Sequence, residues 1–294
     1  MTLSMLIQRV AEQLSHAGVA FGQGTTTAED EAAWLVLWQL GLPLDTDFNE
    51  AAHHAELMPA QIEQVQALIA QRIERRQPAA YLTKEAWLQG VSFYIDERAI
   101  VPRSLIAEVL AEGGIDPWLD PNSRRVLDLC TGNGSLGILA ALAYPQVSVL
   151  GLDLSKDALA VAQINIERHG LEDRMTLAES DGLQQADGLF DLILCNPPYV
   201  NAQSMATLPP EFKAEPALAL AGGTDGMDFV RQLLRDAPAH MNENAMLVLE
   251  IGHEREHFET AFPNLDVVWL STSAGDDQVL LLTRQAMAPS AQKP

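Results

Sequence analysis

The chain has few cysteines and few basic residues. Its 294 residues include 2 cysteines, Cys130 and Cys195, which excludes a disulfide-rich secreted fold and predicts two small, buried, apolar thiols. The 18 lysine and arginine residues stand against 40 acidic ones, giving a formal net charge of −22. Because phosphate neutralisation needs a basic surface, this balance argues against DNA or RNA as a direct substrate. It is compatible with a basic protein partner, with solubility alone or with adaptation to salt.

The sequence also lacks long apolar runs and a targeting signal. Hydrophobic residues make up 48% of the chain, but no unbroken run is long enough to cross a bilayer. Residues 1–6 lack the basic region, apolar core and small-residue cleavage site of a signal peptide. We therefore expect a cytoplasmic protein without a membrane partner, long enough for more than one domain.

Residues 196–199, Asn-Pro-Pro-Tyr, end the apolar run at residues 190–195. The run predicts a buried parallel strand, and two prolines, which have no N–H to donate, stop its ladder. In an open α/β sheet, ligands bind at the carboxyl ends of the strands. The Asn196 amide, the Pro197 carbonyl and the Tyr199 ring suit a planar group that bears an NH2. For these four residues alone, a simple strand-ending turn remains possible.

A glycine-rich loop lies upstream and favours the ligand-binding interpretation. Glycines let the backbone approach a ligand, and the N-terminus of the following helix faces it. Asp153 ends the next predicted strand, where a carboxylate can accept hydrogen bonds from ribose hydroxyls. A third strand leads to Ser180 and Asp181. The predicted order is a strand at 124–129, the loop at 130–137, a helix at 138–143, a strand at 147–152, a helix from Ser155 to His169 and a strand near 175–177.

The remaining segments predict helices first and strands later. Stripes such as Leu6, Val10 and Leu14 indicate a small helical bundle up to about residue 76. Residues 86–95 and 99–101 suggest a β-hairpin that turns at 96–98, and residues 208–224 suggest a functional lid or binding loop. We further predict strands at 245–249, 265–270 and 278–282, a disordered tail from Met287, and a solvated His53–His54 pair.

At this point the chain resembles the class I S-adenosylmethionine-dependent methyltransferases, and more narrowly the N5-glutamine methyltransferases that modify translation proteins. The nearest branch methylates a glutamine of large-ribosomal-subunit protein three. The likeness is stronger from about residue 75 onward. Cys130 replaces the first loop glycine, which favours this branch over the one that modifies release factors. Besides the loop and residues 196–199, the stretches that carry the resemblance are Val101-Pro102-Arg103-Ser104, Asp128-Leu129-Cys130-Thr131-Gly132, and residues 208–231 with Glu215-Pro216 and Gly222-Gly223-Thr224-Asp225-Gly226.

The resemblance implies an α/β, Rossmann-like fold with a seven-stranded, mostly parallel sheet, helices on both faces and an N-terminal helical domain. It implies a substrate-recognition domain at residues 1–76, a connector with a β-hairpin at 77–103 and the methyltransferase domain at 104–294. It also implies S-adenosyl-L-methionine as cofactor, S-adenosyl-L-homocysteine as product, no metal, and a basic ribosomal protein as substrate.

The resemblance assigns roles to individual residues. Asn196, Pro197 and Tyr199 are the expected catalytic residues, and with Pro198 they would bind the substrate amide. Asp153 would hold the ribose and Asp181 the adenine amine. The expected cofactor-binding residues are Asp128, Cys130, Thr131, Gly132, Asn133, Gly134, Asp153, Asp181, Asn196 and Arg103.

Further functions stay open on the sequence. A DNA adenine-N6 methyltransferase can carry the same Asn-Pro-Pro-Tyr, although the acidic charge counts against it. Residues 253–257 match the HExxH pattern of zinc peptidases, but they directly follow a predicted strand instead of lying inside a long helix. Methylation of peptide chain release factors is also compatible with the motifs, as is a non-catalytic binding role for the same fold.

Overall fold

The computed structural model describes residues 1–48 and 55–287, which divide into two compact units. Within the described residues, unit 1 comprises 1–86 and 208–215, and unit 2 comprises the rest. The domain boundaries predicted after residues 76 and 103 stay predictions. The expectations for His53, His54 and residues 288–294 concern residues outside the described part of the chain.

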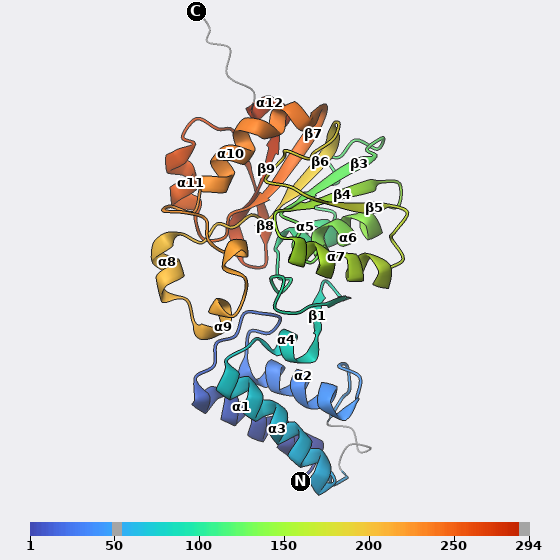
Figure 1. Cartoon of the computed structure of the whole chain (residues 1–294), viewed down its shortest axis with the longest axis vertical. Coiled ribbons are helices and arrows are strands. Elements are labelled where there is room, and N and C mark those ends of the chain that lie inside the picture. The colour runs from blue at the N-terminus through green and yellow to red at the C-terminus, as the bar shows by residue number, and fades with distance from the viewer. Residues whose placement is uncertain (49–54, 288–294) are drawn as a thin grey trace, which may run out of the picture. The chain divides into compact units, whose positions relative to one another are not determined.

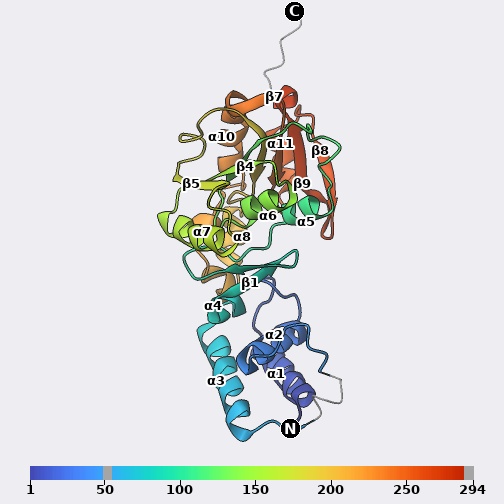
Figure 2. The same cartoon turned by 90° about the vertical axis from the view of Figure 1, so that its right-hand side faces the viewer.

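Unit 1 is built on three helices that pack against one another (Figures 1 and 2). The side chains of Thr2 and Thr27 accept hydrogen bonds from the first turns of two of them, and Gly18 and Gly41 end these helices in the left-handed conformation. The predicted apolar stripes are buried here, which confirms the helical N-terminal region. The helices of unit 1 are α1 (Leu3–Ala17), α2 (Ala28–Leu40), α3 (Pro59–Arg75), α4 (Ala79–Thr83) and α9 (Pro210–Lys213).

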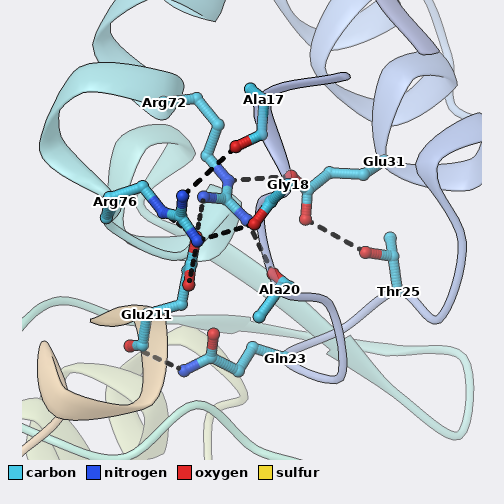
Figure 3. Close-up of polar contacts among 9 residues, drawn as sticks. All are labelled: Ala17, Gly18, Ala20, Gln23, Thr25, Glu31, Arg72, Arg76 and Glu211. Carbon is cyan, nitrogen blue, oxygen red and sulfur yellow. Dashed lines mark hydrogen bonds and ion pairs between the residues drawn. The ribbon is translucent and has the colours of Figure 1, made fainter. Parts of the chain in front are cut away.

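A buried group of charges lies inside unit 1 (Figure 3). Arg72, which is 1% exposed, donates to Glu31 at 2.8 Å, to Glu211 at 3.2 Å and to the Ala20 carbonyl at 2.9 Å. Arg76 donates to both carboxylate oxygens of Glu211, at 2.5 and 3.1 Å. Glu211 belongs to the segment at residues 208–224, which follows the Asn-Pro-Pro-Tyr motif and is called the insertion below. This part of the insertion is therefore fixed within the helical unit.

Unit 2 contains a seven-stranded sheet with the order β5-β4-β3-β6-β7-β9-β8 (Figure 1). All pairings from β5 to β7 are parallel, whereas β9 runs antiparallel to both β7 and β8. This confirms the predicted seven-stranded, mostly parallel sheet. Its strands are β3 (Arg125–Leu129), β4 (Ser148–Asp153), β5 (Met175–Glu179), β6 (Phe190–Cys195), β7 (Met241–Glu250), β8 (Val268–Thr272) and β9 (Gly275–Thr283).

Helices cover both faces of this sheet. Within β6, Leu192 and Leu194 point into one apolar core, and Ile193 and Cys195 into the other, as the alternation of a strand requires. The first core contains α5 (Ile106–Ala111), α6 (Ser135–Ala143) and α7 (Lys156–Arg168); the second contains α10 (Asp228–Asp236), α11 (Arg255–Ala261) and α12 (Arg284–Met287). Shorter helices are α8 (Ala202–Thr207), η2 (Ala217–Ala219) and η3 (Ala237–His240). No helix among the described residues has the length and apolar character needed to cross a membrane.

A β-hairpin is present, but both of its strands lie, apart from Glu85, within the predicted first strand; residues 99–101 form no strand, so the predicted second strand and the predicted turn at 96–98 are wrong. The two-stranded sheet consists of β1 (Glu85–Leu88) and β2 (Val91–Tyr94), with the turn at Gln89 and Gly90. Both turn residues have positive φ, 49° and 73°, the conformation that suits a two-residue hairpin turn. Glutamine is not a residue that signals this conformation, so the sequence directed attention to residues 96–98 instead. There, Asp96 and Arg98 form an ion pair at 2.7 Å.

Candidate active site

The loop between β3 and α6 adopts the conformation that a close-approaching ligand needs. Cys130, Gly132 and Gly134 all have positive φ, at 59°, 55° and 83°. Gly134 has a φ of 83°, which strains any side chain, and a Cβ atom there would make a tight 3.2 Å contact with Ala162 of α7, so glycine favours this path of the loop. The loop leads directly into the N-terminus of α6, as predicted.

Asp128 organises this loop from within. Its carboxylate accepts hydrogen bonds from the Thr131 hydroxyl at 2.5 Å and from the Gly137 backbone N–H at 2.8 Å. Burial raises the pKa of Asp128 to about 7, against the lowering effect of the Thr131 and Gly137 hydrogen bonds. Its Oδ1 atom is buried and has no hydrogen-bond partner among the described residues. Asp128 therefore shapes the loop and leaves one acceptor oxygen beneath it.

Asn133 connects the loop to its surroundings. Its side-chain oxygen accepts from the Ser135 N–H at 3.0 Å, and its Nδ2 donates to the Ile100 carbonyl at 3.3 Å. Asn165 of α7, fully buried, donates to the Asn133 carbonyl at 2.9 Å and exchanges hydrogen bonds with the Tyr94 backbone. Sequence reasoning missed Asn165, because one polar residue on a helix carries no signal of a partner 32 residues away.

Two carboxylates follow β4 and β5 at the same edge of the sheet. Asp153 ends β4 and accepts from the Gly132 N–H and the Ser155 N–H, both at 2.8 Å. Burial raises the pKa of Asp153, although backbone hydrogen bonds from Ser155 and Gly132 oppose the shift. Asp181 is exposed and lies two residues beyond Glu179, the partner of Asp153 in the β4–β5 register.

The Asn-Pro-Pro-Tyr motif occupies the end of the adjoining strand. Leu129 pairs with Cys195 in the β3–β6 register, so the loop at Cys130 and the motif at Asn196 leave the sheet side by side. Pro197 is buried, and Asn196, Pro198 and Tyr199 are partly buried. Directly after the motif, Val200 forms an isolated parallel bridge with Ala221, which closes the insertion at its base.

The two cysteines lie at these same strand ends. Both are free thiols; Cys195 is buried, as predicted, whereas Cys130 is only partly buried because it belongs to the loop. The pKa of Cys130 is raised well above its ordinary value. The largest cause is a hydrogen bond with Cys195, and the second is burial. The Cys130 thiol is therefore in the neutral form expected of a small packing group.

Arg103 lies in the segment before α5. It is partly buried, and its Nη1 donates to the Val101 carbonyl at 3.3 Å. The neighbouring Ser104 is buried and donates its hydroxyl to Glu250, at the end of β7, at 2.5 Å. Sequence reasoning missed Glu250, since its position along the chain marks only the end of a strand.

Residues 253–257, which match the HExxH pattern, lack the helical geometry of the zinc-peptidase motif. Helix α11 begins at Arg255, so His253 precedes the helix and the two histidines do not share a helical face. The Glu254 carboxylate accepts from the Asn201 amide at 2.6 Å and pairs with His257 Nδ1 at 2.5 Å. The described residues contain no cluster of three or more side chains arranged to hold a metal ion. Glu254 thus holds the chain after the Asn-Pro-Pro-Tyr motif.

The site suits an extended ligand that carries hydrogen-bond donors. A backbone loop, a helix N-terminus and three carboxylates at Asp128, Asp153 and Asp181 meet where neighbouring parallel strands end. Asp181 is exposed at this edge, and the oxygens of Asp153 that accept from the Gly132 and Ser155 N–H groups keep further lone pairs for a ligand donor. Beside them, Asn196 and Tyr199 offer an amide and an aromatic ring. This arrangement can bind a nucleoside-like ligand next to a planar acceptor.

Known proteins resemble this chain in sequence and in fold. A family model described as Methyltransferase small domain matches residues 115–224. The ribosomal protein uL3 glutamine methyltransferase of Bordetella pertussis is 51% identical over 97% of this chain and 96% of its own. That of Burkholderia pseudomallei is 49% identical over 96% and 94%. In structure, the hMettl16 catalytic domain in complex with MAT2A 3'UTR hairpin 6 aligns with a TM-score of 0.53 and 13% identity, over 83% of this chain and 88% of that one, which shows the class I methyltransferase fold.

Proposed function

The chain belongs to the family of ribosomal protein uL3 glutamine methyltransferases, and from that premise we propose that it methylates the N5 side-chain nitrogen of a glutamine in uL3. The observation that carries the proposal is the placement of the Asn196–Tyr199 motif beside the glycine loop, at the ends of the paired strands β6 and β3. This placement supports binding of an acceptor amide at the motif beside a nucleoside at the loop, in a chain whose relatives carry that name.

S-adenosylmethionine would supply an electrophilic methyl group on a positively charged sulfur, and no metal is needed for it. The loop at 130–134 would bind its methionine end, with Asp128 holding the loop in shape. Asp153 would accept hydrogen bonds from the ribose hydroxyls, and Asp181 from the adenine amine. Arg103 stays a cofactor-binding candidate through its position before α5.

The acceptor amide is a poor nucleophile because its nitrogen lone pair is delocalised into the carbonyl. The work of the protein is therefore orientation. The Asn196 side-chain oxygen and the Pro197 carbonyl would accept the two amide hydrogens, and Tyr199 would stack on the amide plane. Both oxygens also favour the partial positive charge that develops on nitrogen during transfer. The proton released from the product leaves to water.

The proposed substrate is a basic ribosomal protein, which suits the net charge of −22. Residues 1–76 would recognise it, and no nucleic acid is needed as a direct substrate. A cytoplasmic location follows from a ribosomal substrate.

The direct test is mass spectrometry of uL3 incubated with purified protein and S-adenosylmethionine. A single added methyl group on one glutamine is expected, and the variant of uL3 with asparagine at that position should stay unmodified. A release factor and adenine-containing double-stranded DNA serve as competing acceptors. Methylation of either of these, with none of uL3, would replace the proposal by release-factor or DNA methylation, respectively.

A further inference from the structure

Three glycines of unit 2 enclose Tyr199 so closely that only hydrogen fits. A Cβ atom on Gly252 would lie 2.5 Å from the Tyr199 ring carbon Cε2, and one on Gly222 would lie 2.7 Å from the Tyr199 Cα. A Cβ on Gly226 would run into the Tyr199 carbonyl oxygen. Gly222 lies near the end of the insertion, Gly226 lies just after it, and Gly252 follows β7. The ring and backbone of Tyr199 are therefore fixed by packing from two separate segments.

The tyrosine hydroxyl reaches a buried carboxylate. Tyr199 Oη donates to Glu250 Oε1 at 3.3 Å. The other oxygen, Oε2, accepts from the Ser104 hydroxyl at 2.5 Å and from the Leu105 N–H at 2.9 Å. Glu250 is only 4% exposed, and burial raises its pKa although these donors oppose the shift. The Glu250 carboxylate thus connects the Asn-Pro-Pro-Tyr motif to the two residues that precede α5.

A buried carboxylate is a costly way to fill space. An apolar side chain would pack at the end of β7 without the desolvation that a carboxyl group suffers. Its hydrogen bonds offset that cost only while all its donors keep their geometry. The free energy of the buried Glu250 carboxyl group therefore depends on where the Tyr199 hydroxyl lies. An apolar side chain at this position would not depend on the hydroxyl in this way.

We propose that Glu250 is a positioning residue for methyl transfer, acting through Tyr199. It holds the hydroxyl end of the tyrosine while Gly252 supports the ring, so that the ring plane is set before the acceptor amide arrives. This inference rests on the proposed stacking of Tyr199 on that amide. The hydrogen-bond partners of Glu250 are Tyr199, Ser104 and Leu105, and none of them is an expected cofactor-binding residue, so its effect should appear in turnover rather than in cofactor affinity.

A double-mutant cycle tests the link between Glu250 and the tyrosine hydroxyl. Glu250→Gln keeps the shape of the side chain, and Tyr199→Phe keeps the ring. Each should lower kcat for the protein substrate by about tenfold, while the cofactor Kd changes less than about twofold. If Glu250 acts through the hydroxyl, the double variant should be no slower than the slower single variant. Multiplying effects, or an unchanged kcat in Glu250→Gln with only a lower Tm, would overturn the proposal.

A second pair of variants tests the support of the ring. Gly252→Ala places a methyl group against the ring at a residue with φ of 54°. Gly170→Ala is the matched control, because its φ is 64° but a Cβ there meets nothing within 4 Å. Both should lose similar stability from backbone strain. Only Gly252→Ala should lose kcat, by about tenfold or more; equal kcat in the two variants would contradict the role of the ring.

The proposed function and the positioning role fail in different ways. If the wild-type protein does not methylate uL3, the substrate assignment fails, and the cycle is run with whichever acceptor the wild type modifies. If the wild type methylates uL3 but the two substitutions act independently, the positioning role alone is wrong.

Discussion

Three aspartates at the carboxyl edge of the sheet differ in what surrounds them. Asp128 is fully buried and accepts from its own loop. Asp153 is partly buried and accepts from two backbone donors, whereas Asp181 is exposed. The same residue type can thus shape the loop in one place and remain available to a ligand in another. Substitutions at these positions should separate folding from binding.

Asp153 and Asn196 should give opposite kinetic phenotypes. Asp153→Ala removes charge-assisted hydrogen bonds worth roughly 1.5–3 kcal/mol, so the cofactor Kd should rise by about tenfold to a hundredfold. Asn196→Ala removes the acceptor that we propose for the substrate amide, so kcat should fall roughly a hundredfold with the cofactor Kd nearly unchanged. Calorimetry with the cofactor and single-turnover rates distinguish the two. Weakened cofactor binding with normal turnover in Asn196→Ala would remove that residue from the acceptor site.

Asp128 should make stability depend on pH. Because burial raises its pKa from 3.8 to about 7, the folded protein binds more protons than the unfolded chain between these values. The stabilisation is fully present below pH 3.8 and is lost as the pH rises through about 7. Relative to Asp128→Asn, the wild type should lose up to about 1.4 kcal/mol of unfolding free energy per pH unit across that window. Urea unfolding of both proteins at several pH values measures this, and a constant difference would contradict it.

At the scale of elements, the sequence predicted the helices and strands whose limits depend on residues close by in the chain. Apolar runs predicted β3, β4 and β6, and the helix predicted from Ser155 to His169 agrees with α7, whose N-cap and C-cap are these two residues. The hairpin turn was misplaced because Gln89 adopts positive φ without a residue type that signals it. Strand β8 begins at Val268, later than its apolar run suggested, and its pairing with β9 sets that limit.

The site residues that escaped prediction share a different cause. Asn165 and Glu250 act through partners distant in sequence, at Tyr94 and Ser104. A single polar residue on a helix or at a strand end is usually solvated, so only the fold reveals that these two are buried. The glycine loop at 130–137 and the Asn-Pro-Pro-Tyr motif were recognisable because glycine permits, and proline restricts, the local backbone conformation.

The buried charges around Arg72 give a prediction for the insertion. Glu211→Gln would leave Arg72 and Arg76 without their shared carboxylate, so unfolding should become easier by about 3–5 kcal/mol. Arg76→Gln should cost less, because Arg72 still pairs with Glu211 at 3.2 Å. Arg75→Gln is the control, since Arg75 is exposed on the same helix, and it should change stability by less than about 0.5 kcal/mol. Chemical denaturation ranks the three; equal losses at residues 75 and 76 would show that the cluster does not stabilise the unit.

At the scale of the whole molecule, the dominant property is the net charge of −22. Charge of this size acts over distances comparable to the Debye length, so it influences encounter with a partner more than the geometry of the site. It repels nucleic acid and attracts a basic protein. The active-site chemistry is independent of this field, which allows the two contributions to be measured separately.

Salt should therefore slow methylation of the proposed protein substrate and spare a small one. Attraction between opposite charges is screened over about 10 Å at 0.1 M ionic strength, so the second-order rate constant for a basic ribosomal protein should fall as salt rises. A short neutral peptide with the same glutamine should react slowly, since it lacks the docking surface, but with little dependence on salt. Initial rates at limiting substrate over a salt series compare the two directly. If both substrates respond equally to salt, the net charge serves solubility or salt adaptation and not the encounter with substrate.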